Sequence, residues 1–281
     1  MKTVVIPTRN DNYGMFLAER AIQCLNSMTA VFDEVIVVDW NSPHDLPLIE
    51  QIIDYLEPTG KIKNITVSKK FISENVKFGS QPCCEVLARN IGIRRAKGDW
   101  IVSSNIDIIA TPFSTEQLNE NTLYTVPKYN VMENVHLTQL LPISNHDKVF
   151  NLKANKHLFE RMKRCEEVVP SDKYSLIVGC GDFQVAHKNV WNTIRGFEES
   201  LLHRCFADTN VMVKAAAHPN LKTDILEIDV FHLEHKNNPY FWKKDSVTTR
   251  NSQKDANETY SITKNQDSWG FDGVDFEQII I

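Results

Sequence analysis

Short apolar runs and helical apolar patterns alternate along the first 110 residues of the chain. The apolar runs predict strands at 3–6, 34–38, 62–67 and 99–103, the first of them ended by Pro7. Apolar positions at helical spacing predict helices at 16–25, 46–56 and 85–96, the last closed by Gly98 as a C-cap. Strands that are apolar throughout are buried on both faces. This alternation therefore predicts an α/β fold with a mostly parallel, doubly wound sheet.

The pattern is looser after residue 110. Strands are expected at 123–129, 174–178, 183–186 and 225–233, and helices at 190–194 and 208–217. From residue 236 onward polar residues dominate, and such a tail either wraps the domain or forms a mobile lid. We therefore expect one domain over residues 1–281, with a doubly wound half at 1–110, an α+β half at 111–235 and a tail at 236–281.

Composition and charge exclude several classes of protein. The chain has 281 residues, of which 42% are apolar, so it can bury a sizeable core and is too apolar to be disordered. A formal net charge of −5 argues against a general nucleic-acid binder. The sequence contains no apolar run long enough for a transmembrane segment, and the run before Pro7 is too short for a signal peptide. The six cysteines form no CxxC pair, which is typical of free thiols in a cytoplasmic chain.

Polar residues follow three of the predicted strands. The segments are TRND at 8–11, DWNS at 39–42 and SNID at 104–107. Ligands of an open α/β sheet bind beyond the carboxyl ends of its strands, so these residues are candidate ligand contacts. Neither GxGxxG nor GxxxxGK[ST] is present, which disfavours dinucleotide and P-loop sites. Carboxylates and amides suit a nucleotide-sugar, with Mg²⁺ or Mn²⁺ offsetting the diphosphate charge.

Several segments resemble, in order, the motifs of family-2-like glycosyltransferases of the GT-A fold. They are VVIPTRN at 4–10, VIVVD at 35–39, ARNIGIRRAKG at 88–98, NID at 105–107, GDF at 181–183, RGFEE at 195–199, AD at 207–208 and HLEH at 232–235. The sequence departs from the family at Asn105, the first position of its DxD metal motif, and at Ala207, where the family has the Glu of its ED pair. The variants at 9–14 and 39–43 resemble a subgroup from bacteria and large DNA viruses, including chlorovirus capsid-glycan enzymes such as xylosyltransferases.

The resemblance implies a role for each candidate site residue. Asp208 would be the catalytic base, and Asp182 and Glu199 would orient the acceptor. The metal ligands would be Asp107, His235 and His232. The nucleotide-sugar would contact Pro7, Thr8, Arg9, Asn10, Asp39, Trp40, Arg89 and Asn105.

These roles have structural alternatives that the sequence leaves open. Trp40 either stacks on the base or fills the core, and Arg89 either forms an ion pair on the helix surface or contacts the diphosphate or the loop of Asp107. Strand alternation places His232 and His235 on opposite faces, and His235, at the strand's end, is the preferred metal ligand. Asp208 is either the base or an anion at a helix N-terminus.

The activity implied by the resemblance is an inverting, metal-dependent transfer of a hexose or pentose from a UDP-sugar to a glycan hydroxyl. The expected partners are a nucleotide diphosphate sugar donor and a glycan acceptor, with Mn²⁺ or Mg²⁺ as the cofactor. Three alternatives remain: a retaining transferase of the same fold, a sugar-phosphate nucleotidyltransferase and a non-catalytic nucleotide-sugar-binding scaffold. The lack of a glycine-rich loop after the first strand disfavours the nucleotidyltransferase, whereas Asn105 and Ala207 motivate the scaffold.

Overall fold

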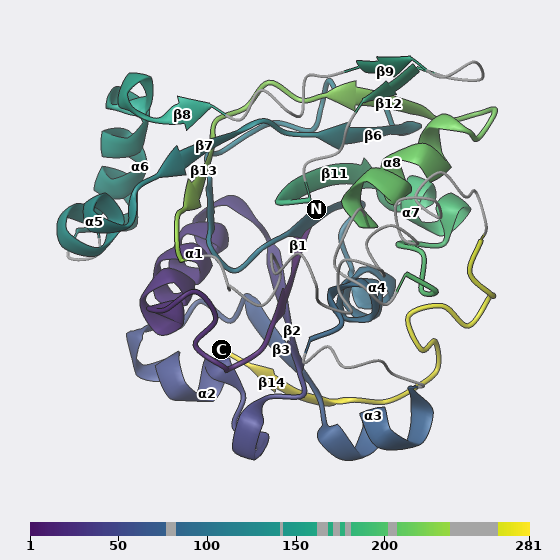
Figure 1. Cartoon of the computed structure of the whole chain (residues 1–281), viewed down its shortest axis with the longest axis horizontal. Helices are drawn as coiled ribbons and strands as arrows, with labels where there is room; N and C mark the ends of the chain where they lie inside the picture. The colour runs from purple at the N-terminus through teal and green to yellow at the C-terminus, as the bar shows by residue number, and fades with distance from the viewer. Residues whose placement is uncertain are drawn as a thin grey trace, which may run out of the picture.

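A large mixed sheet forms the centre of the molecule (Figure 1). The computed structural model describes residues 1–76, 83–140, 143–161, 168–170, 175–177, 181–201, 207–236 and 264–281. Within these residues the strand order is β12-β6-β11-β4-β1-β2-β3-β14. The strands are β1 (Lys2–Thr8), β2 (Glu34–Trp40), β3 (Ile62–Val67), β4 (Trp100–Ser104), β6 (Thr122–Thr125), β11 (Phe183–His187), β12 (Lys222–Ile225) and β14 (Glu277–Ile280). The four adjacent strands β4, β1, β2 and β3 are parallel, as expected for a doubly wound sheet.

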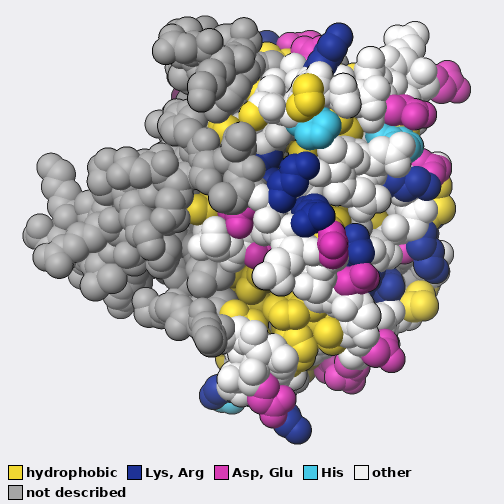
Figure 2. Space-filling view, turned by 90° about the vertical axis from the view of Figure 1, so that its right-hand side faces the viewer, with side chains coloured by type: hydrophobic (Ala, Val, Ile, Leu, Met, Phe, Trp, Pro, Cys, Tyr) yellow, Lys and Arg dark blue, Asp and Glu magenta, His cyan; other side chains and the backbone are white. Residues whose placement is uncertain are grey.

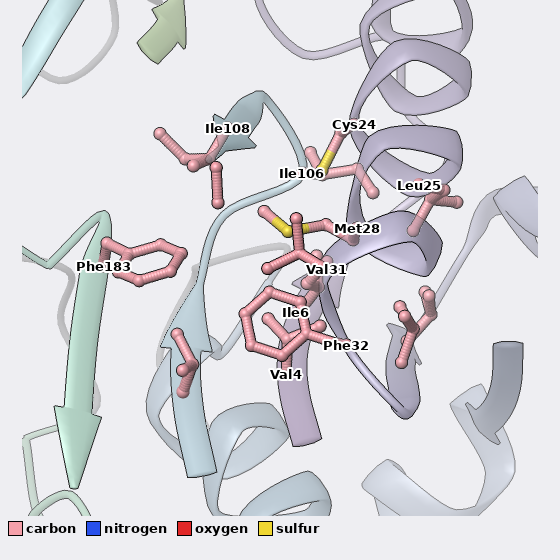
Figure 3. Packing of buried hydrophobic residues seen from close by; sticks show 14 of the residues in the cluster. Val4, Ile6, Cys24, Leu25, Met28, Val31, Phe32, Ile106, Ile108 and Phe183 are labelled. Atoms are coloured by element: carbon pink, nitrogen blue, oxygen red, sulfur yellow. The ribbon is translucent and has the colours of Figure 1, made fainter. Parts of the chain in front are cut away.

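Helices cover both faces of this sheet. They are α1 (Leu17–Val31), α2 (Leu48–Ile52), α3 (Lys69–Asn75), α4 (Glu85–Arg95), α7 (Lys188–Ile194) and α8 (Ala207–Ala216). Two others, α5 (Glu133–Val135) and α6 (Asn145–Ala154), pack against the second, smaller sheet. Side chains of β1 alternate between two cores, because successive residues of a strand point to opposite faces. Val4 and Ile6 pack with α1 and α2, whereas Val5 packs with α4, α7 and α8. Figure 3 shows the first core, where Met28 of α1 lies among β1 and Phe183.

Two predictions about element ends are wrong for reasons of packing. β1 continues through Pro7 because its pairing with β4 ends at Val5, so the missing N–H of Pro7 faces no partner strand on that side. Gly98 does not cap α4, which ends at Arg95, and its φ is not positive. A Cβ at Gly98 would lie 2.8 Å from the backbone N of Thr3, so Gly98 is needed for close approach to β1.

Beyond residue 110, two predicted long strands are each divided between two sheets. The segment predicted at 123–129 forms β6 in the main sheet and β7 (Lys128–Val131) in a second sheet. The segment predicted at 225–233 likewise forms the end of β12 and then β13 (Val230–Leu233). The second sheet has the order β5-β13-β7-β8, with β5 at Ile108–Ala110 and β8 at Glu160–Arg161. A separate pair, β9 (Val168–Pro170) and β10 (Ser175–Ile177), is antiparallel.

The described part of the tail, residues 264–281, wraps around the domain. It passes α4 and ends in β14, which pairs antiparallel with β3 at the edge of the main sheet (Figure 1). Arg95 of α4 holds it by donating hydrogen bonds to the carbonyls of Gly270, Phe271 and Val274. Figure 2 shows the side of the molecule that lies to the right in Figure 1, with Lys and Arg side chains gathered near its centre. Residues 237–263, which the lid alternative also concerned, lie outside the described residues.

Candidate functional site

The candidate site lies where the parallel strands end. Thr8 of β1 is the register partner of Asp39 of β2, so the carboxyl ends of these strands are adjacent. β4 ends beside them at Ser104 and leads through Asn105 to Asp107. The polar segments that follow three separate strands are therefore brought to one edge of the sheet, which is where α/β folds bind ligands.

Asp39 is held by one oxygen, and its other oxygen is unused. Its Oδ2 accepts hydrogen bonds from Ser42 Oγ (2.8 Å) and from the backbone N of Leu48 (3.1 Å). Ser42 Oγ also accepts from the backbone N of Asn10 (2.8 Å), which ties the loop after β1 to the end of β2. Asp39 Oδ1 and Thr8 Oγ1 are buried without a partner. Burial raises the pKa of Asp39 to about 6, so the carboxylate is poised to accept a proton or a hydrogen bond.

The other predicted nucleotide contacts of β1 and β2 differ in accessibility. Arg9 follows β1 and forms an ion pair with Asp11, with Nε and Oδ2 3.7 Å apart. Pro7 lies inside β1, paired with Val38. Trp40 is only 1% exposed and belongs to the core beneath α4. This burial favours the core-filling alternative for Trp40 over stacking on a base.

Asp107, His232 and His235 converge on one point. Asp107 Oδ2 lies 3.1 Å from His235 Nε2 and 3.7 Å from His232 Nε2. One ligand atom from each residue lies within 4.8 Å of the others, which is a spacing that a single metal ion can bridge. Both histidines reach Asp107 because β13 ends at Leu233, so the strand alternation that would separate them does not extend to His235.

Backbone contacts fix the position of these three residues. The N–H of Leu233 donates to Asp107 O (2.8 Å), which joins β13 to the segment before β5. His235 packs against the turn at 12–16, where Tyr13 meets it edge-on with ring centroids 5.1 Å apart. A Cβ at Gly14 would lie 2.3 Å from His235 Nδ1, and Gly14 has a φ of +72°. Glycine is therefore required at position 14 both by the turn and by the imidazole.

The charges around Asp107 favour its ionised form. Burial opposes ionisation, but His232, the hydrogen bond from His235 and the guanidinium of Arg20 together hold the pKa of Asp107 below its usual range. The pKa of His232 is lowered, chiefly because burial disfavours the imidazolium. A neutral imidazole beside a carboxylate is the protonation state that a metal ion requires.

The three residues fit a divalent metal by their chemistry and by their unused atoms. Asp107 Oδ1 and His232 Nδ1 are buried and have no hydrogen-bond partner, although most buried polar atoms in proteins have one. A carboxylate with two imidazoles is a donor set that suits Mn²⁺ better than Mg²⁺, which prefers oxygen ligands. Asn130, the register partner of His232, contributes a further buried oxygen without a partner.

A chain of polar contacts connects α4 to the α+β half of the chain. Arg89 donates to Ser103 Oγ (2.6 Å), to Ser104 O (3.0 Å) and to the amide oxygen of Asn105. The amide nitrogen of Asn105 donates to Asp182 Oδ1 (2.6 Å). Asp182 Oδ2 pairs with Lys128 Nζ at 2.7 Å. Arg89 therefore holds the loop after β4, which is one of the contacts that its motif implies, and it also lies 3.8 Å from Glu85 on the same helix. Asn105 uses both ends of its amide in the same chain of contacts.

Asp208 lies at the start of α8, beside the segment that carries Asp182. Its carboxylate accepts hydrogen bonds from the backbone N of Gly181 (3.1 Å) and of Thr209 (2.9 Å). A Cβ at Gly181 would lie 2.9 Å from Asp208 Cβ, so glycine allows this close approach. Burial raises the pKa of Asp208, and the nearby negative charge of Asp182 adds to the shift. A raised pKa makes Asp208 a stronger base than an exposed carboxylate.

Glu199 forms hydrogen bonds with a different set of residues from those of Asp182 and Asp208. Its Oε1 accepts from Asn90 Nδ2 (3.0 Å) and from the backbone N of Gly270 in the tail (2.7 Å). This carboxylate joins α4 to the tail, which is a structural role that the prediction of an acceptor contact did not include.

Two site residues were missing from the sequence predictions. Arg20 donates to Asp107 Oδ2 from α1 (3.1 Å), and Lys128 pairs with Asp182 from β7. An arginine on an amphipathic helix is typical of a solvent-exposed face, so the sequence carries no signal for its burial. Lys128 lies in a segment that was predicted as one strand, whose division between two sheets depends on long-range pairing.

Comparisons with known proteins give a likeness of fold. No family model matches the sequence, and no curated protein matches it. GalNAc-T7, solved with UDP, GalNAc and Mn²⁺, has a TM-score of 0.53 and 11% identity over 89% of this chain. S. aureus TarS 1–349, solved with UDP, has a TM-score of 0.49 and 14% identity over 83% of this chain. The chain spans 47% of the GalNAc-T7 chain and 60% of the TarS chain.

These findings settle the fold class and leave the finer expectations open. The comparisons do not support the expected likeness to chlorovirus enzymes. None of the helices in the described ranges is long and apolar enough to cross a membrane. The α/β architecture, with its mostly parallel central sheet, is that of the GT-A glycosyltransferase fold.

Proposed function

We propose that this chain is a metal-dependent glycosyltransferase that moves a sugar from a nucleotide diphosphate donor to a hydroxyl of a glycan. The observation that carries the proposal is the cluster of Asp107, His232 and His235 at the carboxyl edge of the parallel strands. Its buried atoms without a hydrogen-bond partner are suited to a ligand at that place, and the unpartnered Oδ1 of Asp39 lies at the same edge of the sheet. The UDP and Mn²⁺ in the GalNAc-T7 structure give the choice of donor and metal additional support.

The base of the donor fits the unused atoms at the ends of β1 and β2. Asp39 Oδ1 is a hydrogen-bond acceptor without a donor, and it is buried beside Thr8. The ring N–H of uracil would supply such a donor, so we infer that UDP is the nucleotide. Arg9 and Asn10 follow directly on the same strand end, within the reach of the ribose or the diphosphate.

Transfer needs a base on the acceptor side, and Asp208 is our candidate. In the ionised state it would accept the proton of the attacking hydroxyl. Asp182, which is paired with Lys128, would orient the acceptor. A divalent cation held by Asp107, His232 and His235 would stabilise the departing diphosphate electrostatically. Direct displacement at the anomeric carbon inverts its configuration. We therefore propose an inverting enzyme and keep a retaining one as the alternative.

A panel of nucleotide sugars tests this proposal. We expect one UDP-sugar to raise the melting temperature in the presence of Mn²⁺ and to release UDP slowly without an acceptor. A ligand at a hundredfold excess over its Kd stabilises a protein by about 2.7 kcal/mol, which a thermal-shift assay resolves. Asp107→Asn should abolish the Mn²⁺-dependent shift, whereas Asp272→Asn, on the exposed tail, should retain it. Binding without any hydrolysis or transfer would favour the non-catalytic scaffold, and no binding of any nucleotide sugar would overturn the proposal.

A further inference from the structure

Arg20 is a cation buried next to the candidate metal ligands. Its side chain is 0% exposed, and Nη1 lies 3.1 Å from Asp107 Oδ2. Its other nitrogens donate to the backbone carbonyls of Tyr13 and Met15, in the turn that packs against His235. The proposed function uses Asp107 as a metal ligand and does not involve Arg20.

Asp107 is the anion that pairs with Arg20. Glu19 and Glu133 are near enough to influence Arg20 electrostatically, but among the described residues only Asp107 is within ion-pair distance of it. Oδ2 of Asp107 is shared by Arg20, His232 and His235, while Oδ1 is buried without a partner. The negative charge of the cluster is therefore already balanced before any metal binds.

A divalent cation that binds these residues leaves the site with excess positive charge. Asp107 supplies one negative charge, Arg20 supplies one positive charge, and two neutral imidazoles supply none. The positive charge of Arg20 then opposes the cation at short range and in a buried environment. A diphosphate brings several negative charges and removes this imbalance. The same arrangement therefore disfavours a free cation and favours one that arrives with a diphosphate.

We propose that Arg20 is an internal counter-cation of Asp107, which keeps the site weak for a free divalent metal ion so that the ion is bound together with the diphosphate. This inference rests on the proposed function, because it requires the three ligands to bind a metal. It makes Arg20 a residue that sets metal affinity through Asp107, and not a metal ligand.

The opposing interpretation is that Arg20 is a clamp that positions the ligands. Its bonds to Tyr13 and Met15 hold the turn against His235, and its bond to Asp107 orients the carboxylate. Loss of a clamp weakens metal binding, whereas loss of a counter-cation strengthens it. The two interpretations therefore predict changes of opposite sign for the same substitution.

Manganese binding without nucleotide separates them. The titration follows the electron paramagnetic resonance of free Mn²⁺ with the folded wild-type chain, Arg20→Gln and Arg20→Lys, first alone and then with UDP. Gln removes the charge and keeps a hydrogen-bond donor, whereas Lys keeps the charge. We expect Arg20→Gln to bind Mn²⁺ roughly tenfold more tightly or better, because removal of a nearby like charge has at least this effect at short range. Arg20→Lys should stay within about threefold of the wild type, since it retains the charge.

Two further variants serve as a control and as a replacement. Arg94→Met removes an arginine of the Asp272 pair on α4, away from the ligands, and should leave Mn²⁺ binding unchanged. Arg20→Met takes the place of Arg20→Gln if the latter does not fold. Unchanged or weaker Mn²⁺ binding by the uncharged variant that folds would overturn the inference while leaving the proposed function intact. Absence of Mn²⁺ binding in the wild type and in every variant, even with UDP, would overturn the metal site itself.

Discussion

Two clusters of buried polar side chains differ in how completely their atoms are bonded. The tail cluster consists of Asn90, Glu199 and Asn265. Asn90 uses both ends of its amide, on Phe197 and Glu199, and Asn265 also uses both ends of its amide. The strand-end cluster consists of Thr8, Asp39, Asp107, His232 and His235, and four of its buried polar atoms have no partner.

The difference separates a structural cluster from a binding site. A buried polar atom without a hydrogen bond destabilises a protein by about 1–3 kcal/mol, and a ligand that bonded the four atoms gathered at the strand ends would remove this destabilisation. The tail cluster already satisfies its members and therefore contributes to stability. We expect substitutions in the tail cluster to lower stability, and those at the strand ends to change ligand binding without lowering stability.

The largest effect is expected at Asp208, next to the site. Asp208→Asn should lower the transfer rate by about 10² to 10⁴-fold, the usual contribution of a general base, and change donor affinity by less than about threefold. Because the pKa of Asp208 is raised, the wild-type rate should fall as the pH is lowered through that pKa. Rates at saturating donor and donor affinities by calorimetry test both points. Glu199→Gln, the matched change in the tail cluster, should leave the rate near that of the wild type, and a normal rate in Asp208→Asn would exclude Asp208 as the base.

Asp39 should make stability depend on pH. Burial raises its pKa in the folded chain to about 6, above the ordinary value of 3.8, so the folded state holds this proton more tightly than the unfolded state. The contribution to stability is fully present below about pH 4 and is lost as the pH rises through 6. A shift of this size corresponds to about 3 kcal/mol. Asp39→Asn should therefore gain about 3 kcal/mol relative to the wild type between pH 4 and pH 8, measured by urea unfolding. A pH-independent difference between the two proteins would contradict the raised pKa.

The first half of the fold was predictable because its signals are local. The strand predicted at 62–67 coincides with β3, and α4 begins at the predicted residue, since apolar runs and helical spacing act over a few residues. The two strands predicted at 123–129 and 225–233 were wrong because each crosses from one sheet to another. Only partners distant in the sequence decide where such a segment divides.

The same limit applies to the site. The proximity of Asp107 and His235 was predictable, because strand ends and motif order point to them, and their role as metal ligands stays a prediction. The contact between Arg20 and Asp107 joins residues 87 positions apart, and nothing in the local pattern of α1 distinguishes Arg20 from an exposed arginine. Glu199 shows the same limit, since its motif suggested an acceptor contact, which stays a prediction, and gave no sign of its bonds to Asn90 and Gly270.

A moderate effect on stability is expected in the tail cluster. Asn90→Ala would leave the backbone N–H of Phe197 without its side-chain partner and would remove the bonds that Asn90 donates to Phe197 O and to Glu199, although Phe197 O still accepts from Asn265. We expect a loss of about 2 kcal/mol in the free energy of unfolding. Mn²⁺-dependent stabilisation by UDP should remain, because no strand-end atom is changed. Loss of that stabilisation in a folded Asn90→Ala protein would show that the two clusters are not separable.

The smallest change in stability is expected for Thr8 of β1, and Thr3 of the same strand provides the matched comparison. Thr3 is 0% exposed, donates to Glu34 Oε2 (2.7 Å) and accepts from the backbone N of Gly98 (2.9 Å). Thr8 is 4% exposed, and its Oγ1 has no partner. Valine has nearly the same shape as threonine, so Thr3→Val and Thr8→Val each remove one hydroxyl from the same strand. Thr3→Val should destabilise the chain by about 1–3 kcal/mol, since two partners lose a hydrogen bond.

For Thr8→Val we expect a free energy of unfolding within about 0.5 kcal/mol of the wild type, or slightly higher, because no bond is lost. Its affinity for UDP should fall several-fold, since the hydroxyl is available only to a ligand. Urea unfolding and calorimetry on the two variants measure both quantities. Equal destabilisation by both substitutions would mean that the Thr8 hydroxyl is bonded in solution. Unchanged UDP affinity in Thr8→Val would mean that an unbonded atom at a strand end does not mark the donor site, which would remove the physical basis for dividing the two clusters.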